Sequence, residues 1–111
     1  MSVVKPLEEK YNEDSPAREL AYEDANAKVI RFFLRAGQEI KPHRSPSSVF
    51  ISVLKGRLSF YLGKEDREEI LEAGSTVFYE PEELHGFKAL EDSVVQAVIT
   101  PNPTAKRLSV T

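Results

Sequence analysis

The clearest pattern in the chain is an alternation of residue character between Ser48 and Leu62. Side chains two positions apart lie on the same face of a β-strand. One set of alternate positions holds only apolar residues, namely Val49, Ile51, Val53, Leu58, Phe60 and Leu62. Lys55-Gly56 interrupts the stretch with a turn signal. The stretch therefore predicts two strands joined by a tight turn, with one apolar face each.

Other short segments share this composition and are separated by Gly, Pro, Asp and Glu. They predict further strands at Arg18–Tyr22, Lys28–Arg35, Arg67–Leu71, Ser75–Glu80, His85–Leu90 and Val94–Thr100. A helix over Ala17–Ala27 is possible on propensity alone, with a thin apolar face. Many short strands with turns at regular intervals favour an all-β fold, either a sandwich or a closed barrel.

The strand at Lys28–Arg35 is apolar on both faces. Ile30, Phe32 and Leu34 share one face, while Val29 and Phe33 share the other. Such a strand needs cover on both sides. The cover is expected from the N-terminal segment or from a second subunit.

The first residues, Met1 to Pro16, are polar and acidic and lack any apolar alternation. We expect them to form an extended or poorly ordered arm. The predicted organisation is therefore an arm at 1–16 followed by one β-barrel domain at 17–111, a length that suits a single core.

Charge and composition narrow the choice of partners and compartment. The 111 residues carry a formal net charge of -3 and no cysteine. Nucleic-acid binding requires a basic face, and no cluster of Lys and Arg is present, so no nucleic-acid partner is expected. Disulfides and thiolate metal sites are excluded. No apolar signal segment or membrane-spanning run is found, which predicts a cytoplasmic protein without a membrane partner.

Two motifs follow the strand pattern at fixed spacing. Gly37, five residues, His43, one residue, Ser45 and later Gly56 resemble the first cupin motif, G-x5-H-x-H-x3-E-x6-G. Gly74, five residues, Glu80, then Glu82 and His85 resemble the second, G-x5-P-x-G-x2-H-x3-N. The resemblance covers Ala27 to Pro101. It implies a cupin jelly-roll β-barrel, or double-stranded β-helix, of the small single-domain kind, and with it a homodimer.

In that family the motifs place three histidines and a glutamate around a divalent metal. Carried over by position, the first and last histidines of the motif correspond to His43 and His85. The position of the second histidine holds Ser45, and the position of the glutamate holds Val49. Two imidazoles would hold at most one Zn, Ni, Fe, Mn or Cu ion weakly, with water or substrate completing the shell. Candidates for a third donor are Glu39, Glu80 and Gln96. Glu39 shares the strand parity of His43, although Pro42 between them disturbs the alternation.

Three functions remain open at this point, and no catalytic residue is assigned. The first is binding of a small molecule in the barrel cavity, without chemistry. Its expected contacts are Ser45, Val49, Val53, Phe60 and Gln96, next to the two histidines. The second is a metal-dependent dioxygenase or isomerase that uses His43 and His85. The third is a metal-free isomerase or epimerase with imidazole as the proton-transfer group. Imidazole suits this role because its ordinary pKa is near 6.5.

Overall fold

The computed structural model describes residues 1–5 and 8–104, and these form strands and loops without a helix. The strands, in chain order, are β1 (Ala17–Glu23), β2 (Lys28–Leu34), β3 (Glu39–His43), β4 (Ser48–Lys55), β5 (Arg57–Leu62), β6 (Arg67–Glu72), β7 (Thr76–Tyr79), β8 (His85–Ala89) and β9 (Ser93–Thr100). The all-β prediction is confirmed. The helix considered for Ala17–Ala27 is wrong, because β1 pairs along its length with β2. Strand β3 was not among the predicted strands.

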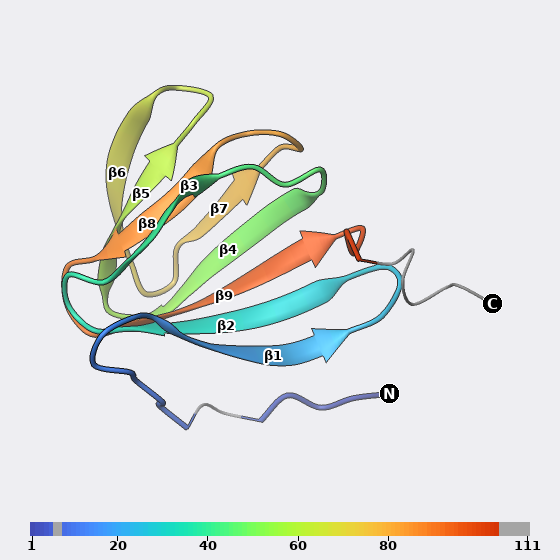
Figure 1. Ribbon diagram of the computed structural model, residues 1–111, viewed down its shortest axis with the longest axis horizontal. Coiled ribbons are helices and arrows are strands. Elements are labelled where there is room, and N and C mark those ends of the chain that lie inside the picture. The colour runs from blue at the N-terminus through green and yellow to red at the C-terminus, as the bar shows by residue number, and fades with distance from the viewer. Residues whose placement is uncertain (6–7, 105–111) are drawn as a thin grey trace.

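Two antiparallel sheets face one another across a common core (Figure 1). The five-stranded sheet has the order β1-β2-β9-β4-β7, and the four-stranded sheet has the order β3-β8-β5-β6. The chain crosses between the sheets repeatedly, so strands adjacent in a sheet are often distant in sequence. Strands β6 and β7 are edge strands, one in each sheet.

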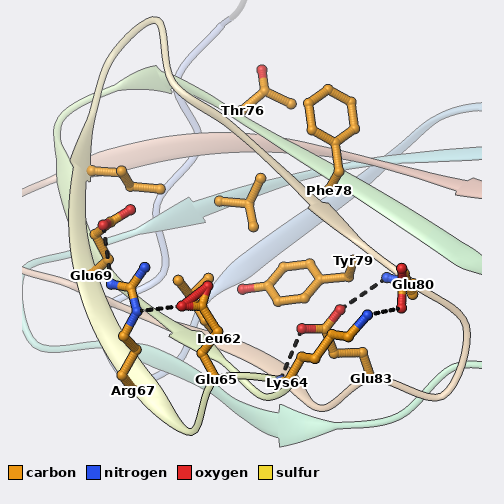
Figure 2. A pocket seen from close by; sticks show the side chains of 12 residues that line it. Leu62, Lys64, Glu65, Arg67, Glu69, Thr76, Phe78, Tyr79, Glu80 and Glu83 are labelled. Carbon is orange, nitrogen blue, oxygen red and sulfur yellow. Dashed lines mark hydrogen bonds and ion pairs between the residues drawn. The ribbon is translucent and has the colours of Figure 1, made fainter.

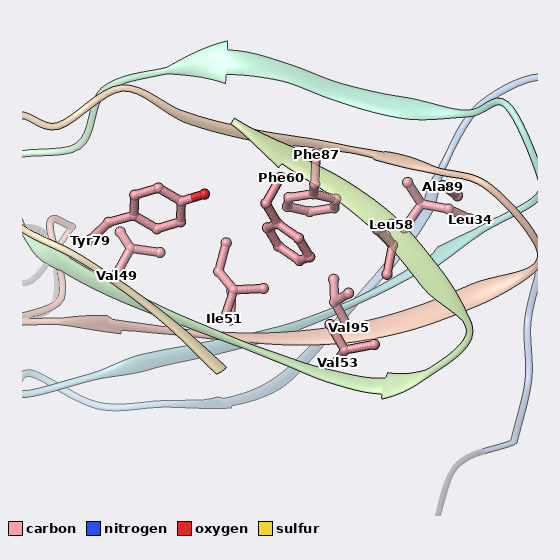
Figure 3. Packing of buried hydrophobic residues seen from close by; sticks show 11 residues of the cluster. Leu34, Val49, Ile51, Val53, Leu58, Phe60, Tyr79, Phe87, Ala89 and Val95 are labelled. Carbon is pink, nitrogen blue, oxygen red and sulfur yellow. The ribbon is translucent and has the colours of Figure 1, made fainter. Parts of the chain in front are cut away.

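The core is made by the inward positions of both sheets, as the alternation predicted (Figure 3). Its buried members are Leu34, Val49, Ile51, Val53, Leu58, Phe60, Tyr79, Phe87, Ala89, Val95 and Ala97. The turn between β4 and β5 is held by Gly56, which has a positive φ of 87°. A Cβ there would lie 2.2 Å from Ser93 Oγ, so only glycine fits this turn.

The second face of β2 is covered from within the same chain. Residues 1–5 and 8–16 form the arm, which crosses the outer side of the five-stranded sheet without regular structure. Tyr11 packs edge-on against Phe33 at a centroid distance of 6.1 Å, and the Arg35 guanidinium lies 4.6 Å from the Tyr11 ring centroid. Of the two kinds of cover expected for this face, the structure shows the arm.

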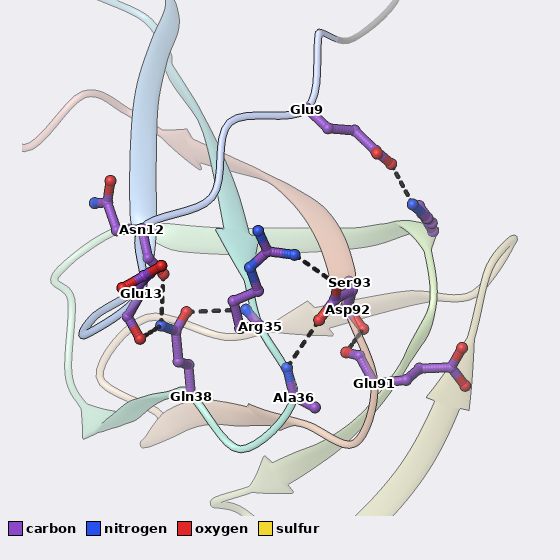
Figure 4. A network of polar contacts seen from close by, with 10 residues as sticks. Glu9, Asn12, Glu13, Arg35, Ala36, Gln38, Glu91, Asp92 and Ser93 are labelled. Atoms are coloured by element: carbon purple, nitrogen blue, oxygen red, sulfur yellow. Dashed lines mark hydrogen bonds and ion pairs between the residues drawn. The ribbon is translucent and has the colours of Figure 1, made fainter.

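Polar contacts fasten the arm to the barrel (Figure 4). Gln38 donates from Nε2 to the carbonyl oxygens of Asn12 and Glu13, at 2.8 and 3.1 Å. Glu9 forms an ion pair with Lys55.

No helix among the described residues is long and apolar enough to cross a membrane. The predicted barrel domain extends to residue 111, and its positions after 104 lie outside the described residues.

Candidate functional site

The two histidines are direct partners across the β3–β8 ladder. His43 pairs with His85, and the centroids of their rings are 4.2 Å apart, with the planes inclined by 59°. His85 is buried, with 4% of its surface exposed, whereas His43 lies open to solvent. The structure thus brings together the two residues that the motifs had singled out.

A β-bulge in β3 makes this pairing possible. Ile40 pairs with Phe87 and His43 with His85, so Lys41 and Pro42 together oppose the single residue Gly86. A Cβ on residue 86 would lie 2.7 Å from Pro42 N, so the close approach of β3 depends on glycine.

The bulge also decides which side chains of β3 face the core. The extra residue turns His43 to the inner face, which it shares with Ile40 and, across the ladder, with His85 and Phe87. Glu39 pairs with Lys88 on the outer face. The structure therefore does not bring Glu39 to the histidines, because the bulge reverses the parity on which that suggestion rested.

Backbone carbonyl groups fix the protonation pattern of both rings. His43 Nδ1 lies 3.0 Å from the carbonyl oxygen of Lys41, and His85 Nδ1 lies 3.0 Å from that of Glu83. A carbonyl oxygen only accepts, so the proton of each neutral ring is on Nδ1. Each Nε2 then carries a lone pair that can accept a hydrogen bond or bind a metal.

Burial lowers the pKa of His85 below its usual value of 6.5, and the nearby His43 acts in the same direction, against the opposing hydrogen bond to the Glu83 carbonyl. The neutral ring is therefore the dominant form of His85 at pH 7. It presents an acceptor rather than a positive charge.

The ring of Tyr79 packs beside the imidazole of His85, with the two ring centroids 5.2 Å apart. Its hydroxyl donates to the Tyr61 carbonyl oxygen at 2.7 Å and so joins β7 of one sheet to β5 of the other. Burial raises the pKa of Tyr79 well above its usual range, so the phenol stays protonated. Sequence reasoning missed this residue, although the inward parity that it shares with Val77 was a usable signal.

The other predicted contact residues are not gathered around the histidines. Val49, Val53 and Phe60 are packed within the apolar core. Ser45 lies in the loop after β3, where its hydroxyl accepts from Ser47 N at 3.2 Å. Gln96 projects from the outer face of the five-stranded sheet, where it accepts from Arg31 Nε at 2.9 Å.

The donors present do not fit a metal centre with three or more protein ligands. Glu80 forms an ion pair with Lys64 at 2.8 Å, and Glu83 accepts from the backbone N–H groups of Lys64 and Glu80. Val49 offers no donor atom at the position of the family's glutamate. Across residues 1–5 and 8–104, no group of three His, Asp, Glu or Cys side chains is arranged to hold an ion. The histidine pair alone supplies two imidazole donors.

Two hollows adjoin this end of the barrel. The larger, about 410 Å³, is a cleft between the edge strands β6 and β7, with Leu62, Leu71 and Val77 among its lining residues (Figure 2). Tyr79 stands between this cleft and His85. The smaller, about 300 Å³, is bounded by Arg44, Gly63 and the loop 80–84. Its lining includes Arg44 and Leu84, the direct neighbours of His43 and His85 in sequence.

Comparison with known proteins now decides the family. The model of the cupin domain matches residues 30–101, which include both histidines and most of the barrel. The chain belongs to the cupin family. No curated protein sequence matches it at a significant level.

Solved structures agree with this assignment at the level of the fold. An RmlC-like cupin from Desulfovibrio desulfuricans is 28% identical, with a TM-score of 0.82 over 91% of this chain and 97% of that one. A double-stranded β-helix protein from Klebsiella pneumoniae is 23% identical, with a TM-score of 0.78 over 86% and 85%. The polyketide cyclase RemF from Streptomyces resistomycificus is 18% identical, with a TM-score of 0.65 over 78% and 63%. These likenesses show a jelly-roll cupin barrel and no particular activity.

Proposed function

We propose that this cupin binds a small hydroxylated molecule and that the imidazoles of His43 and His85 hold it. The observation that carries the proposal is the pair of hydrogen bonds from Nδ1 to the Lys41 and Glu83 carbonyl groups. These bonds leave two Nε2 acceptors on rings 4.2 Å apart. A molecule with neighbouring hydroxyl groups could donate to both.

The surroundings of the pair favour binding over a metal-centred reaction. No third acidic or imidazole donor joins the two rings within the described residues. His85 is desolvated on one side by Tyr79, whereas His43 is open to solvent. A ligand would therefore approach from the His43 side; the hollow of about 300 Å³ near that side is lined by Arg44 and Leu84, the sequence neighbours of the two histidines, and by neither imidazole.

The test is ligand-dependent thermal stabilisation of the purified full chain, measured with a panel of simple sugars, polyols and hydroxy acids. Ligand that binds only the folded protein raises the melting temperature. A stabilising compound should lose its effect in His43→Ala and in His85→Ala. It should keep its effect in Glu39→Ala, the matched control on the outer face of the same strand. Equal stabilisation of all variants would place the ligand elsewhere and contradict the proposal.

A divalent-metal-dependent enzyme is the second candidate, and the free Nε2 atoms are the observation that favours it. Elemental analysis of untagged protein, purified without chelator or added metal, distinguishes the binding module from the metal-dependent enzyme. Near-stoichiometric metal that is lost in His43→Ala would favour the metal enzyme. A folded protein without metal would favour the binding module.

A further inference from the structure

The two sheets end in four edge strands, β1 and β7 in one sheet and β3 and β6 in the other. An edge strand presents unpaired N–H and C=O groups, and proteins protect such edges with charges, prolines and β-bulges. Three of these edges have such protection. Strand β1 has a bulge between Leu20 and Tyr22, β3 has a bulge and Pro42, and four of the six residues of β6 are charged.

Strand β7 is the edge without these features. Its residues, Thr76–Tyr79, include neither a charge nor a proline, and its register with β4 runs without a bulge. Phe78, inside the strand, is 70% exposed. An uncharged edge with an exposed aromatic side chain is a template on which another strand can pair.

The hydrogen bonds between β4 and β7 show which backbone groups of this edge are free. Pairs in an antiparallel ladder alternate between residues that bond to each other and residues whose backbone groups point away. The Val53 N–H donates to the Ser75 carbonyl oxygen at 2.9 Å, so the odd-numbered residues of β7 bond to β4. The N–H and C=O groups of Thr76 and Phe78 therefore point toward the open edge.

The cleft of about 410 Å³ between β6 and β7 lies beside these free groups (Figure 2). Leu62, Leu71 and Val77 supply apolar side chains to its lining. A strand added to β7 would direct every second side chain into this cleft and the others to the outer face beside Phe78. Backbone pairing would thus be combined with burial of apolar side chains, as in other complexes formed by strand addition.

The charges around the cleft favour a basic partner over a second copy of this chain. The lining contains two cations, Lys64 and Arg67, which form ion pairs with carboxylates of the same lining. It contains four carboxylates, namely Glu65, Glu69, Glu80 and Glu83. Two copies joined at this edge would bring two such negative excesses together, whereas Lys or Arg in a partner would complement one.

We propose that β7 binds an extended segment of a partner protein by strand addition. The segment has apolar residues at alternate positions, which enter the cleft, and at least one Lys or Arg, which meets the surplus carboxylates. Two residues of β7 supply the backbone bonds, so the complex is short and reversible. This surface is separate from the imidazole pair, because Tyr79 stands between the cleft and His85.

The test begins with a phage-displayed library of random linear octapeptides, selected on the full chain after depletion on Phe78→Pro. Proline removes the free N–H of residue 78, and an edge strand tolerates it where that N–H faces solvent. Circular dichroism checks that the variant keeps the fold. The enriched peptides should alternate apolar residues and carry Lys or Arg. The synthesised peptide should bind Phe78→Pro about tenfold or more weakly than wild type, because ladder hydrogen bonds are lost.

Two measurements on the peptide complex do not depend on the folding of that variant. Methylation of alternate backbone nitrogens of the peptide should weaken binding by about tenfold or more for the same reason. Bound peptide should slow hydrogen exchange of the Thr76 and Phe78 amides. It should leave exchange of the Val77 and Tyr79 amides unchanged, because these already bond to β4.

Ile70→Pro is the matched control on the edge of β6. The Leu90 N–H donates to the Arg57 carbonyl oxygen, and by the same alternation the N–H of Ile70 points away from β5. This variant should bind the peptide as the wild type does. Failure to enrich any peptide would overturn the proposal, as would equal binding to wild type and to folded Phe78→Pro. A wild-type dimer that Phe78→Pro converts to monomer would assign the edge to a second copy and also overturn it.

Discussion

His43 and His85 lie in register across β3 and β8 only because β3 has one residue more than β8 between the pairs Ile40–Phe87 and His43–His85. The extra residue turns the imidazole of His43 toward that of His85 and turns the carboxylate of Glu39 away. The donor set at this end of the barrel is therefore determined by a backbone irregularity as much as by the motif residues.

Gly86→Ala should disrupt this arrangement. The new methyl group would lie 2.7 Å from Pro42 N and 2.8 Å from the Ile40 carbonyl oxygen, so β3 must move away from β8. We expect a loss of about 1–3 kcal/mol in the free energy of unfolding, measured by urea titration. Lys88→Ala, on the exposed side of the same strand, should change it by no more than about 0.5 kcal/mol. Equal effects would mean that the bulge tolerates a side chain.

Stability should depend on His85 in a defined pH window. Burial lowers the pKa of His85 in the folded state, so the unfolded chain binds a proton more readily than the native protein does. The contribution of the neutral ring is complete above the unfolded pKa of about 6.5 and is lost as the pH falls through the lower folded pKa. Urea titrations at about pH 7.5 and about pH 5.5 should show a loss on acidification that is smaller in His85→Gln.

Carboxylates provide an internal check on that experiment. Hydrogen bonds lower the pKa of Asp24 and of Asp92, so their contributions are lost only at more acidic pH, near and below about 4. A loss between pH 7.5 and 5.5 that is the same in the wild type and in His85→Gln would contradict the role given to His85.

Tyr79→Phe tests the bond that joins the two sheets. The variant removes a buried hydroxyl that donates to the Tyr61 carbonyl oxygen at 2.7 Å and leaves that oxygen without its partner. We expect a loss of about 1–2 kcal/mol in the free energy of unfolding. Tyr61→Phe is the matched control, because the Tyr61 hydroxyl bonds to Asp66 at the surface, and it should cost less than about 0.5 kcal/mol.

Tyr11→Ala tests whether the arm is part of the fold. The ring of Tyr11 covers Phe33 and lies under Arg35, so its removal exposes the outer face of β2. We expect a loss of about 1–3 kcal/mol by thermal or urea unfolding. Tyr11→Phe keeps the ring and should retain most of the stability. If both variants matched the wild type, the arm would contribute nothing to the barrel in solution.

Much of the fold could be predicted because period-two alternation is strong where one face of a strand is buried. The stretch Ser48–Leu62 shows this, since its inward residues form the centre of the core. The side of β9 on which Gln96 lies could not be predicted in this way. Its neighbours from Val94 to Ile99 are apolar at both parities, because the inward residues of β9 pack in the core and Val94 on the outer face is buried beside Phe33.

The candidate site could be predicted only in part for a similar reason. Motif spacing identified His43 and His85, because the positions of these two residues follow from their distance along the chain to the turn glycines of the motifs. Pro42 signalled an irregular strand, but the sequence does not say whether such a strand gains a residue or ends. The role of Tyr79 depends on a backbone carbonyl group of the opposite sheet, and no side-chain pattern encodes that partner.

Val49→Glu tests whether this barrel retains the geometry for a fuller metal centre. Val49 pairs with Tyr79, whose ring contacts His85, so a carboxylate at residue 49 would enter the region of the two imidazoles. A buried carboxylate without a partner is costly, and we expect a loss of several kcal/mol, on the order of 3–5, without metal. Added Zn²⁺ should restore part of the melting temperature, since an ion bound only by the folded state stabilises it.

Val53→Glu separates this effect from simple damage to the core. Val53 is as deeply buried as Val49 and lies four residues further along β4, where its partner is Val95 rather than a residue beside the histidines. The variant should lose similar stability and should recover none of it with Zn²⁺. Zinc rescue of both variants, or of neither, would show that residue 49 does not occupy the ligand position that the motif assigns to it.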